Sequence, residues 1–284
     1  MKRVFEYYEN GNVKSIHTLG ENGQKEGPFQ EFFLHGKIHI QGQYKNDNLD
    51  GIYEEFDIDG FLWVKSHYKN GKLDGSSDEF YPSGLLKSTS ICKNGELEGR
   101  AVGFYENGQI KFEDFYKNGE ETGISRKFYN NGKLEMECLY EEGKKNGLYK
   151  SYYRSGKPKE LGCYKNGERD GIWKEFHPSG YVTKECHYKD GILDGRYVEE
   201  DKYNGKHLEH FYRNGIRDEQ EENERMGLKA RLKQISKQSI PTQWVQDEKK
   251  RMVSDFRSKH PKTSKQNSQN KIINVIKKLL NDGR

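Results

Sequence analysis

The stretch YKNGKLDGSSDEF, from Tyr68 to Phe80, recurs in varied form at a fixed interval along the chain. One variant is YKDGILDGRYVEE, from Tyr188 to Glu200. Glycines at equivalent positions of successive repeats form columns with the same interval, one from Gly36 to Gly180 and one from Gly71 to Gly215. A third column has a glycine every 24 residues without interruption, at Gly27, Gly51, Gly75, Gly99, Gly123, Gly147, Gly171 and Gly195. The chain is therefore a tandem repeat protein.

Aromatic residues follow the same 24-residue register. One column contains Phe32, Phe56, Phe80, Phe104, Phe128, Tyr152 and Phe176. Another contains Tyr44, Tyr68, Cys92, Tyr116, Tyr140, Tyr164, Tyr188 and Tyr212. Nine repeats fit between residues 4 and 219, and the first and last are irregular, as terminal repeats usually are. Such a period is typical of stacked supersecondary units that are too small to bury their apolar faces alone.

Each repeat has the pattern of a β-hairpin. In the third repeat, the run from Ile52 to Phe56 precedes Asp59-Gly60, and the run from Leu62 to Tyr68 precedes Asn70-Gly71. Asp-Gly and Asn-Gly favour turns with positive φ between antiparallel strands. Side chains along the second run are expected to alternate between the two faces, with Leu62, Val64 and Tyr68 on one and Trp63, Lys65 and His67 on the other.

The repeats predict a mainly β fold, an elongated single-layer antiparallel sheet of tandem hairpins over residues 1–219. Nine hairpins at the usual strand spacing would make a sheet about 85 Å long. A single sheet exposes both faces, which agrees with a composition of only 31% hydrophobic and 33% charged residues. Much of the surface would then be open to a partner.

The repeat resembles the MORN repeat variant found in bacterial proteins, because its aromatic, Asn-Gly and Asp-Gly elements recur together over residues 4–219. Cys92, Glu141-Glu142 and Asn146 depart from that pattern in individual repeats. Bacterial chains of this kind are similar to the YwqK-type antitoxin family. That resemblance implies a role in binding and neutralising a partner toxin.

Charge divides the chain near residue 220. Residues 220–284 hold 16 Lys and Arg against 7 Asp and Glu, a net charge of +9, whereas residues 1–219 hold 33 against 38, a net charge of −5. The N-terminal sequence shows no apolar run of signal-peptide length, and no stretch is long enough for a membrane span. We therefore expect a cytoplasmic protein with a repeat region, 1–219, and a basic helical tail, 220–284.

The repeat pattern does not bring together the kinds of residue that form catalytic or metal sites. Cys138 and Cys186 share a column two repeats apart, roughly 19 Å, so they cannot form a disulfide. Cys163 is out of register with them and Cys92 replaces a column tyrosine, so we expect reduced, packed thiols. The histidines are scattered and the glycines open no phosphate loop. We predict no enzyme activity, no metal or other cofactor and no small-molecule substrate.

Acidic residues precede several column glycines, at Asp50, Asp74, Glu98, Asp170 and Asp194. A cation-binding ladder is one interpretation, but Asp beside Gly is ordinary turn chemistry. Thr122 and Asn146 interrupt the column, which favours the turn interpretation.

Two other columns are candidate contact surfaces. A basic ladder of Lys45, Lys69, Lys93, Lys117, Lys165, Lys189 and Arg213 suits an acidic partner or is simply solvated. An aromatic column lies three places before the Phe56 column, and alternation would put it on the opposite face. It consists of Phe29, Tyr53, Tyr149, Trp173 and Tyr197. These rings are our candidate partner-binding residues, with packing against neighbouring repeats as the alternative.

The tail has helical spacing in three places. Leu228, Leu232 and Ile235 predict a first helix that ends before Pro241, and Val245, Met252 and Phe256 indicate a second. The apolar residues between 272 and 280 predict a short amphipathic helix, with Lys271, Lys277 and Lys278 alongside them as candidate basic contacts. The tail would cap the open edge of the last hairpin, or bind a protein partner, an anionic membrane surface or nucleic acid.

The favoured function is a non-catalytic protein-binding scaffold of the antitoxin or immunity type, which neutralises a toxin encoded nearby by occluding it. One alternative is nucleic-acid or membrane-surface binding through residues 220–284. Another is a glycan or cell-wall binding module, because aromatic and glycine hairpin repeats also occur there.

Overall fold

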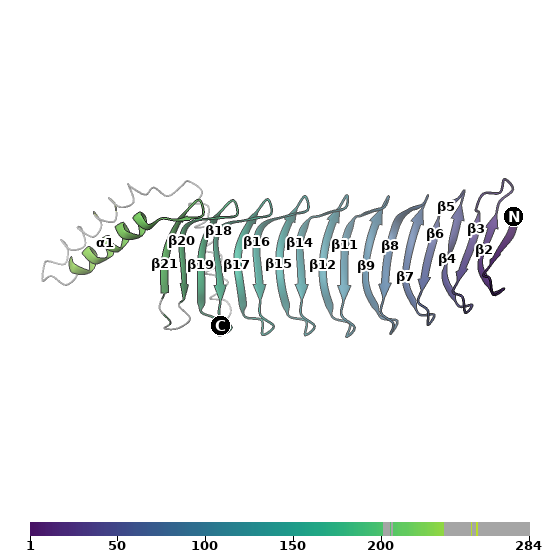
Figure 1. Cartoon of the computed structure of the whole chain (residues 1–284), viewed down its shortest axis with the longest axis horizontal. Coiled ribbons are helices and arrows are strands. Elements are labelled where there is room, and N and C mark those ends of the chain that lie inside the picture. Colours follow the sequence, from purple (N-terminus) through teal and green to yellow (C-terminus); the bar gives the residue numbers. More distant parts are fainter. Residues whose placement is uncertain (201–204, 206, 236–250, 252–253, 255–284) are drawn as a thin grey trace. The chain divides into compact units, whose positions relative to one another are not determined.

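A computed structural model describes residues 1–200, 205, 207–235, 251 and 254 (Figure 1). These residues contain 22 strands and a single helix, so the predicted mainly β fold is confirmed. The chain divides into two compact units. One comprises Met1–Gly167 with Pro178–Gly180, and the other Glu168–His177 with the chain from Tyr181 onward.

The first compact unit contains the strands β1 to β17. Their bounds are β1 Lys2–Tyr7, β2 Val13–Leu19, β3 Gly27–Phe32, β4 Ile38–Lys45, β5 Asn48–Leu49, β6 Gly51–Phe56, β7 Leu62–Lys69, β8 Lys72–Phe80, β9 Leu86–Lys93, β10 Glu96–Leu97, β11 Gly99–Phe104, β12 Ile110–Lys117, β13 Glu120–Glu121, β14 Gly123–Phe128, β15 Leu134–Glu141, β16 Lys144–Tyr152 and β17 Pro158–Lys165. The second holds β18 Glu168–Phe176, β19 Val182–Lys189, β20 Ile192–Glu200, β21 His207–Arg213, β22 Ile216–Arg217 and the helix α1 Glu219–Ile235.

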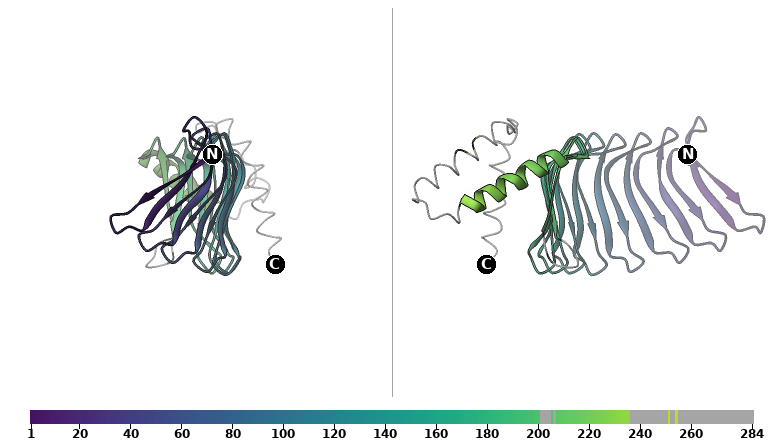
Figure 2. Two further views of the ribbon diagram at one scale, coloured as in Figure 1. Left: turned by 90° about the vertical axis from the view of Figure 1, so that its right-hand side faces the viewer. Right: turned by 60° about the vertical axis from the view of Figure 1, so that its left-hand side comes forward.

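Neighbouring strands pair antiparallel in both compact units. In the third repeat, β6 pairs with β7 from Gly51 opposite Tyr68 to Glu55 opposite Val64, and the register then shifts at Phe56. Within the first compact unit the strands lie in chain order and fan out toward the N-terminus, which is the twist expected of a sheet (Figure 2). The hairpin predicted for each repeat is thereby confirmed.

The two kinds of turn differ in conformation. At Asn70-Gly71 both residues have positive φ, 49° and 78°, which is the two-residue type I′ hairpin turn. At Asp59-Gly60 only Gly60 has positive φ, 88°, and its N–H donates to the carbonyl of Asp57 at 2.9 Å. This second turn is a three-residue loop in which glycine follows a type I turn. Similar dipeptides therefore build different turns, because the loops differ in length.

A row of buried side chains crosses one face of the sheet. We call it the buried row; its members are Phe29, Ser66, Ala101, Ser125 and Cys138 in the first compact unit, and Trp173 and Cys186 in the second. Large and small residues are paired across strands, such as Phe29 with Gly42 and Tyr53 with Ser66. A Cβ atom on Gly42 would lie 2.9 Å from the Phe29 ring, so this pairing depends on glycine.

Gly103 offers a test of this dependence on glycine in another pair of strands, β11 and β12. It lies opposite Phe112, and a Cβ atom there would come within 2.1 Å of Cε1 of that ring. We expect Gly103→Ala to lower the free energy of unfolding by about 1–3 kcal/mol through overpacking, measured by urea denaturation. Gly227→Ala is the matched control, because no atom lies within 4 Å of its added Cβ in α1. Alanine there should stabilise the helix by up to about 1 kcal/mol. Equal effects of the two substitutions would contradict the steric explanation.

The start of the predicted tail packs against the last long strand. Asp218 accepts the N–H of Glu221 at 3.0 Å and caps α1. The N–H of Asp218 donates to the carbonyl of Phe211 in β21 at 2.7 Å, and Glu222 accepts the N–H of Phe211 at 3.0 Å. These contacts hold the start of α1 against β21, and a capping role for the tail as a whole stays a prediction. The second predicted helix and the segment with Lys271, Lys277 and Lys278 lie outside the described residues.

Candidate binding surfaces

The predicted aromatic contact column is mostly covered. Phe29 and Trp173 are only 3% exposed and belong to the buried row, so the expectation of exposed rings is wrong for these two. Tyr53, Tyr149 and Tyr197 are half-buried. Burial next to Glu55 raises the pKa of the Tyr53 hydroxyl to about 12. Partner binding by the column stays a prediction, and only these three tyrosines have surface to offer it.

The aromatic column shares its face with the Tyr68 column. Ring centroids of Tyr53 and Tyr68 are 5.5 Å apart, and those of Tyr149 and Tyr164 are also 5.5 Å apart. The prediction that the aromatic column lies on the face opposite the Phe56 column counted three residues back from Phe56. The register shift between Glu55 and Phe56 interrupts the alternation of side chains between the two faces at that point. The rings therefore pack on one another across strands.

Basic side chains cover some of these rings. In the first compact unit, Lys145 lies over Tyr149 and Tyr164, with Nζ 5.5 and 4.9 Å from the ring centroids. In the second, the guanidinium of Arg169 lies 4.2 Å from the centroid of Trp173. Cation–π contact of this kind stabilises a packed aromatic cluster. It also reduces the area that a partner can reach.

The acidic column has a structural role. Carboxylates accept the backbone N–H of the asparagine that begins a later turn: Asp50 from Asn70 at 3.1 Å, Asp74 from Asn94 at 3.2 Å and Glu98 from Asn118 at 2.9 Å. Asp194 and Asn214 repeat the contact in the second compact unit. The turn interpretation is thus confirmed for these residues. The described residues contain no cluster of His, Cys, Asp and Glu suited to a metal ion.

The cysteines are free thiols, as predicted. Cys92, Cys138 and Cys186 are buried, and Cys163 is half-buried. Burial raises the pKa of both the Cys138 and the Cys186 thiols to about 11. These thiols are therefore poor nucleophiles at neutral pH.

Thiol labelling should separate the cysteines. At pH 8 we expect Cys138 and Cys186 to react with a maleimide about 100-fold more slowly than a free cysteine, because so little thiolate forms. Mass spectrometry of timed samples gives the rates, with Cys163 as the more accessible internal reference. Urea should bring all sites to one rate. Fast labelling of Cys138 in the folded chain would contradict its burial.

The basic ladder lies in solvent beside the type I′ turns. Lys45, Lys69, Lys93 and Lys117 are exposed in the first compact unit. Arg213 in the second is engaged by Asp218 at 3.0 Å. The lysines give this edge a regular series of positive charges, and binding of an acidic partner there remains a prediction.

On the sheet face opposite the buried row, charged side chains of the first compact unit neutralise one another. Glu113 pairs with Arg100 at 2.6 Å and with Arg126 at 3.5 Å, and Glu137 pairs with Arg126 at 2.8 Å and with Lys150 at 3.4 Å. The three cations and two carboxylates of this ladder sum to only +1, so it presents little net charge to a partner. It contributes little to long-range attraction.

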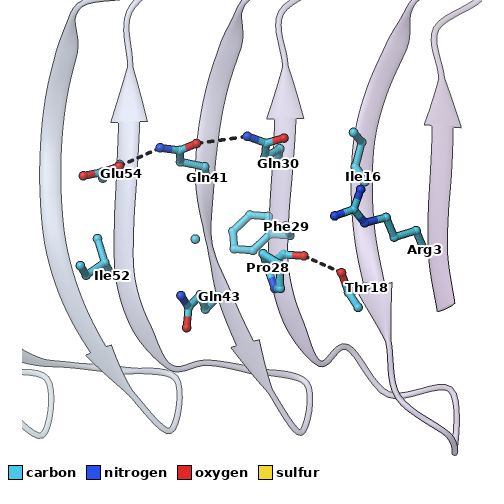
Figure 3. A pocket seen from close by; sticks show the side chains of 11 residues that line it. Arg3, Ile16, Thr18, Pro28, Phe29, Gln30, Gln41, Gln43, Ile52 and Glu54 are labelled. Atoms are coloured by element: carbon cyan, nitrogen blue, oxygen red, sulfur yellow. Dashed lines mark hydrogen bonds between the residues drawn. The ribbon is translucent and has the colours of Figure 1, made fainter. Parts of the chain in front are cut away.

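An open hollow of about 430 Å³ lies near the N-terminal strands (Figure 3). Side-chain amides cross it in a hydrogen-bonded line, from Gln30 to Gln41 at 3.2 Å and from Gln41 to Glu54 at 2.8 Å. Figure 3 shows Arg3 and Ile16 at one side and Ile52 at the other. The amides of Gln30 and Gln41 and the carboxylate of Glu54 are thus hydrogen-bonded to one another across the hollow.

Large apolar side chains gather at the three-residue turns of the second to fourth repeats. We call this group the turn-end apolar cluster; its members are Leu34, 56% exposed, Ile58, 62%, Phe61, 52%, Trp63, 49%, and Leu85, 49%. Counterparts in the fifth and sixth repeats are polar: Glu106, Gln109, Lys111, Asn130 and Lys133. The hairpin therefore folds without apolar residues at these places. The cluster was not predicted from the sequence. Its signal there is that apolar residues replace the polar residues found at the same positions of other repeats.

Six segments of the chain match the MORN repeat variant. They cover residues 3–19, 25–46, 97–118, 121–142, 145–166 and 169–190. A search of curated proteins found no match. MORN repeats are generally binding modules rather than enzymes. The interval between the second and third matched segments, residues 47–96, contains Ile58, Phe61, Trp63 and Leu85, so most of the turn-end apolar cluster lies in a stretch that the MORN repeat variant does not match.

No helix among the described residues is both long and apolar enough to cross a membrane.

Proposed function

We propose that this chain is a non-catalytic protein-binding scaffold of the antitoxin or immunity type, which neutralises a partner protein by occluding it. The observation that carries the proposal is the turn-end apolar cluster. Its residues are exposed, and the repeats fold with polar residues at the same places. Phe61 and Trp63 line one hollow. Adjoining exposed apolar side chains mark interaction sites, and tryptophan is a frequent anchor of protein interfaces.

The six MORN matches support a binding role in general terms. The antitoxin role adds a specific consequence: the partner must have an activity that the bound scaffold blocks. Occlusion by a rigid repeat surface needs no chemistry from the scaffold.

Purification of the tagged full chain from its native host tests the function. We expect one protein partner in stoichiometric amount, encoded by an adjacent gene, toxic when expressed alone and inactive in the complex. Trp63→Ala should weaken the complex, whereas Lys111→Ala, at the same place two repeats later, should leave it unchanged. A chain that purifies only by itself beside non-toxic neighbouring genes would contradict the proposal.

A second candidate function rests on the net charge of +9 in residues 220–284. We propose that Lys271, Lys277 and Lys278 contact a polyanion, either nucleic acid or an anionic membrane. Replacement of these three by alanine should abolish salt-dependent binding to a DNA or RNA duplex or to phosphatidylserine vesicles. The control replaces the exposed Lys45, Lys69 and Lys93, with the same change in charge. Equal losses from both triple variants would contradict a specific role for the tail.

A further inference from the structure

Tyrosines at the three-residue turns link successive repeats. The hydroxyl of Tyr81 donates to the carbonyl of Phe104 at 2.8 Å, and that of Tyr105 to the carbonyl of Phe128 at 2.7 Å. Tyr129 makes the same bond to Tyr152 at 2.7 Å. Each ring thus starts at its own turn and reaches the backbone of the next repeat. We call these residues the turn tyrosines.

In the third repeat Asp57 stands in place of the turn tyrosine. Its Oδ1 accepts the N–H groups of Asp59 and Phe61, both at 2.9 Å, so the aspartate serves its own turn. Among the described residues no side-chain donor reaches the carbonyl of Phe80, the acceptor that a tyrosine at position 57 would use. The link between the third and fourth repeats is therefore missing.

A hollow of about 390 Å³ lies where the absent ring would be. It is lined by Asp57, Phe61, Trp63, Phe80, Tyr81 and Lys87, together with Leu62 and Pro82. A short aspartate side chain beside large aromatic walls accounts for the space.

Other repeats show what belongs between these walls. The counterpart of Trp63 in the fifth repeat is Lys111, whose Nζ lies 5.9 Å from the ring centroid of Tyr105. In the second repeat the counterpart is His39, whose ring lies 4.3 Å from that of Phe33. The residue at this place therefore covers an aromatic ring of its own repeat. In the third repeat the residue at this place is Trp63, but Asp57 provides no aromatic ring for its indole to cover.

The hollow's lining includes two acceptor residues that other repeats lack or use differently, Asp57 and the backbone of Phe80. Phe80, whose carbonyl receives no side-chain donor, and Asp57 both line it, whereas the charge of Lys87 is balanced by Glu79 at 3.1 Å. Such a site is complementary to an aromatic ring that carries a hydrogen-bond donor, and to a cation beside it. Among side chains, tyrosine provides the ring and the donor together.

We propose that this hollow receives a tyrosine side chain of the partner protein, with the ring against Trp63 and Phe61 and the hydroxyl donating to the carbonyl of Phe80. A basic residue of the partner next to that tyrosine pairs with Asp57. The partner thereby completes the link that the third repeat lacks. This inference rests on the proposed function and names the chemistry that its binding surface recognises.

Two matched small probes test the site in the full chain. N-acetyltyrosinamide and N-acetylphenylalaninamide differ only in the hydroxyl, and binding is followed by the Trp63 indole N–H in ¹H–¹⁵N NMR spectra. We expect both probes to shift this signal and the tyrosine probe to bind about 3- to 10-fold more tightly, as one hydrogen bond allows. Equal affinities, or no shift with either probe at solubility, would overturn the proposal.

Substitutions at position 57 provide the second arm. Asp57→Tyr should fill the hollow from within, restore the bond to Phe80, raise the thermal midpoint and abolish the probe-induced shift. Asp57→Asn keeps the turn bonds and the hollow, and should still bind the neutral probe. If Asp57→Tyr does not fold, Phe61→Ala serves instead, because it removes a wall of the hollow but keeps the Trp63 reporter, and it should weaken probe binding. A folded Asp57→Tyr variant that binds the probe like the wild type would refute the assignment.

The captured partner separates the two proposals. If the wild-type chain captures no stoichiometric protein, the proposed function fails and the probes alone decide the nature of the hollow. If wild-type and Asp57→Tyr chains capture the same partner equally well, the scaffold function stands and the tyrosine site is wrong. We expect Asp57→Tyr to lose the partner and Asp57→Asn to retain it more weakly.

Discussion

Replacement of Trp173 by alanine is expected to lower the free energy of unfolding of the second compact unit by about 3–5 kcal/mol. The indole is 3% exposed, lies opposite Cys186 in the pairing of β18 with β19, and has the Arg169 guanidinium 4.2 Å from its centroid. Its removal leaves a cavity that flat neighbouring strands cannot collapse to fill. It also removes the nearer of the two rings beside the Arg169 guanidinium, the other being Tyr188 at 5.5 Å.

Hydrogen exchange is the appropriate measurement, because repeat proteins unfold locally. Amides of β18 and β19 should lose protection in the variant, while amides of β6 and β7 keep it. Trp63→Ala is the matched control: that side chain is 49% exposed, so its loss should cost about 1 kcal/mol or less. Similar losses of protection from both substitutions would contradict the division between a buried and a surface tryptophan.

The hairpins were predictable because their signals are local. Asn70-Gly71 and the alternation from Leu62 to Tyr68 depend only on residues next to one another, and the 24-residue period repeats the evidence many times. The structure confirms the strands and the positive φ of Asn70 and Gly71. Local conformational preference and period therefore carry most of this fold.

The coverage of the aromatic column was not predictable in the same way. Whether a ring is buried depends on its cross-strand partner, such as Gly42 beside Phe29, and on basic residues such as Lys145 four places earlier. The register shift at Phe56 also invalidates counting across it. These are properties of paired strands, which a single column does not contain.

The hollow at Asp57 shows a different reason for a missed site. A column contains what recurs, whereas the candidate site is a departure from it: an aspartate in the place of a turn tyrosine, and apolar side chains where other repeats have lysine, glutamine or asparagine. The structure gives that departure its meaning, since it shows the bond that tyrosine makes and aspartate cannot.

Acid should release α1 from the edge of β21 through a single carboxylate. Glu222 is 7% exposed, accepts the Phe211 N–H and pairs with Arg217 at 2.8 Å. These contacts, chiefly the hydrogen bond from Arg217, lower the pKa of the carboxyl to about 2. Because the folded pKa lies below the unfolded value of about 4.3, the stabilisation is complete above that value. It is lost as the pH falls toward 2.

Glu222→Gln should remove that dependence and weaken the contact at neutral pH by about 1.5–3 kcal/mol, the usual contribution of a hydrogen bond to a charged group. Exchange of the Phe211 amide, followed from pH 7 to pH 2.5, measures both effects. Glu219→Gln removes the same charge from the first turn of α1 at an exposed place, so it controls for the helix dipole. Only Glu222→Gln should expose the Phe211 amide at pH 7. If both variants retain the wild-type acid profile, the edge is held by the Asp218 backbone bond and not by Glu222.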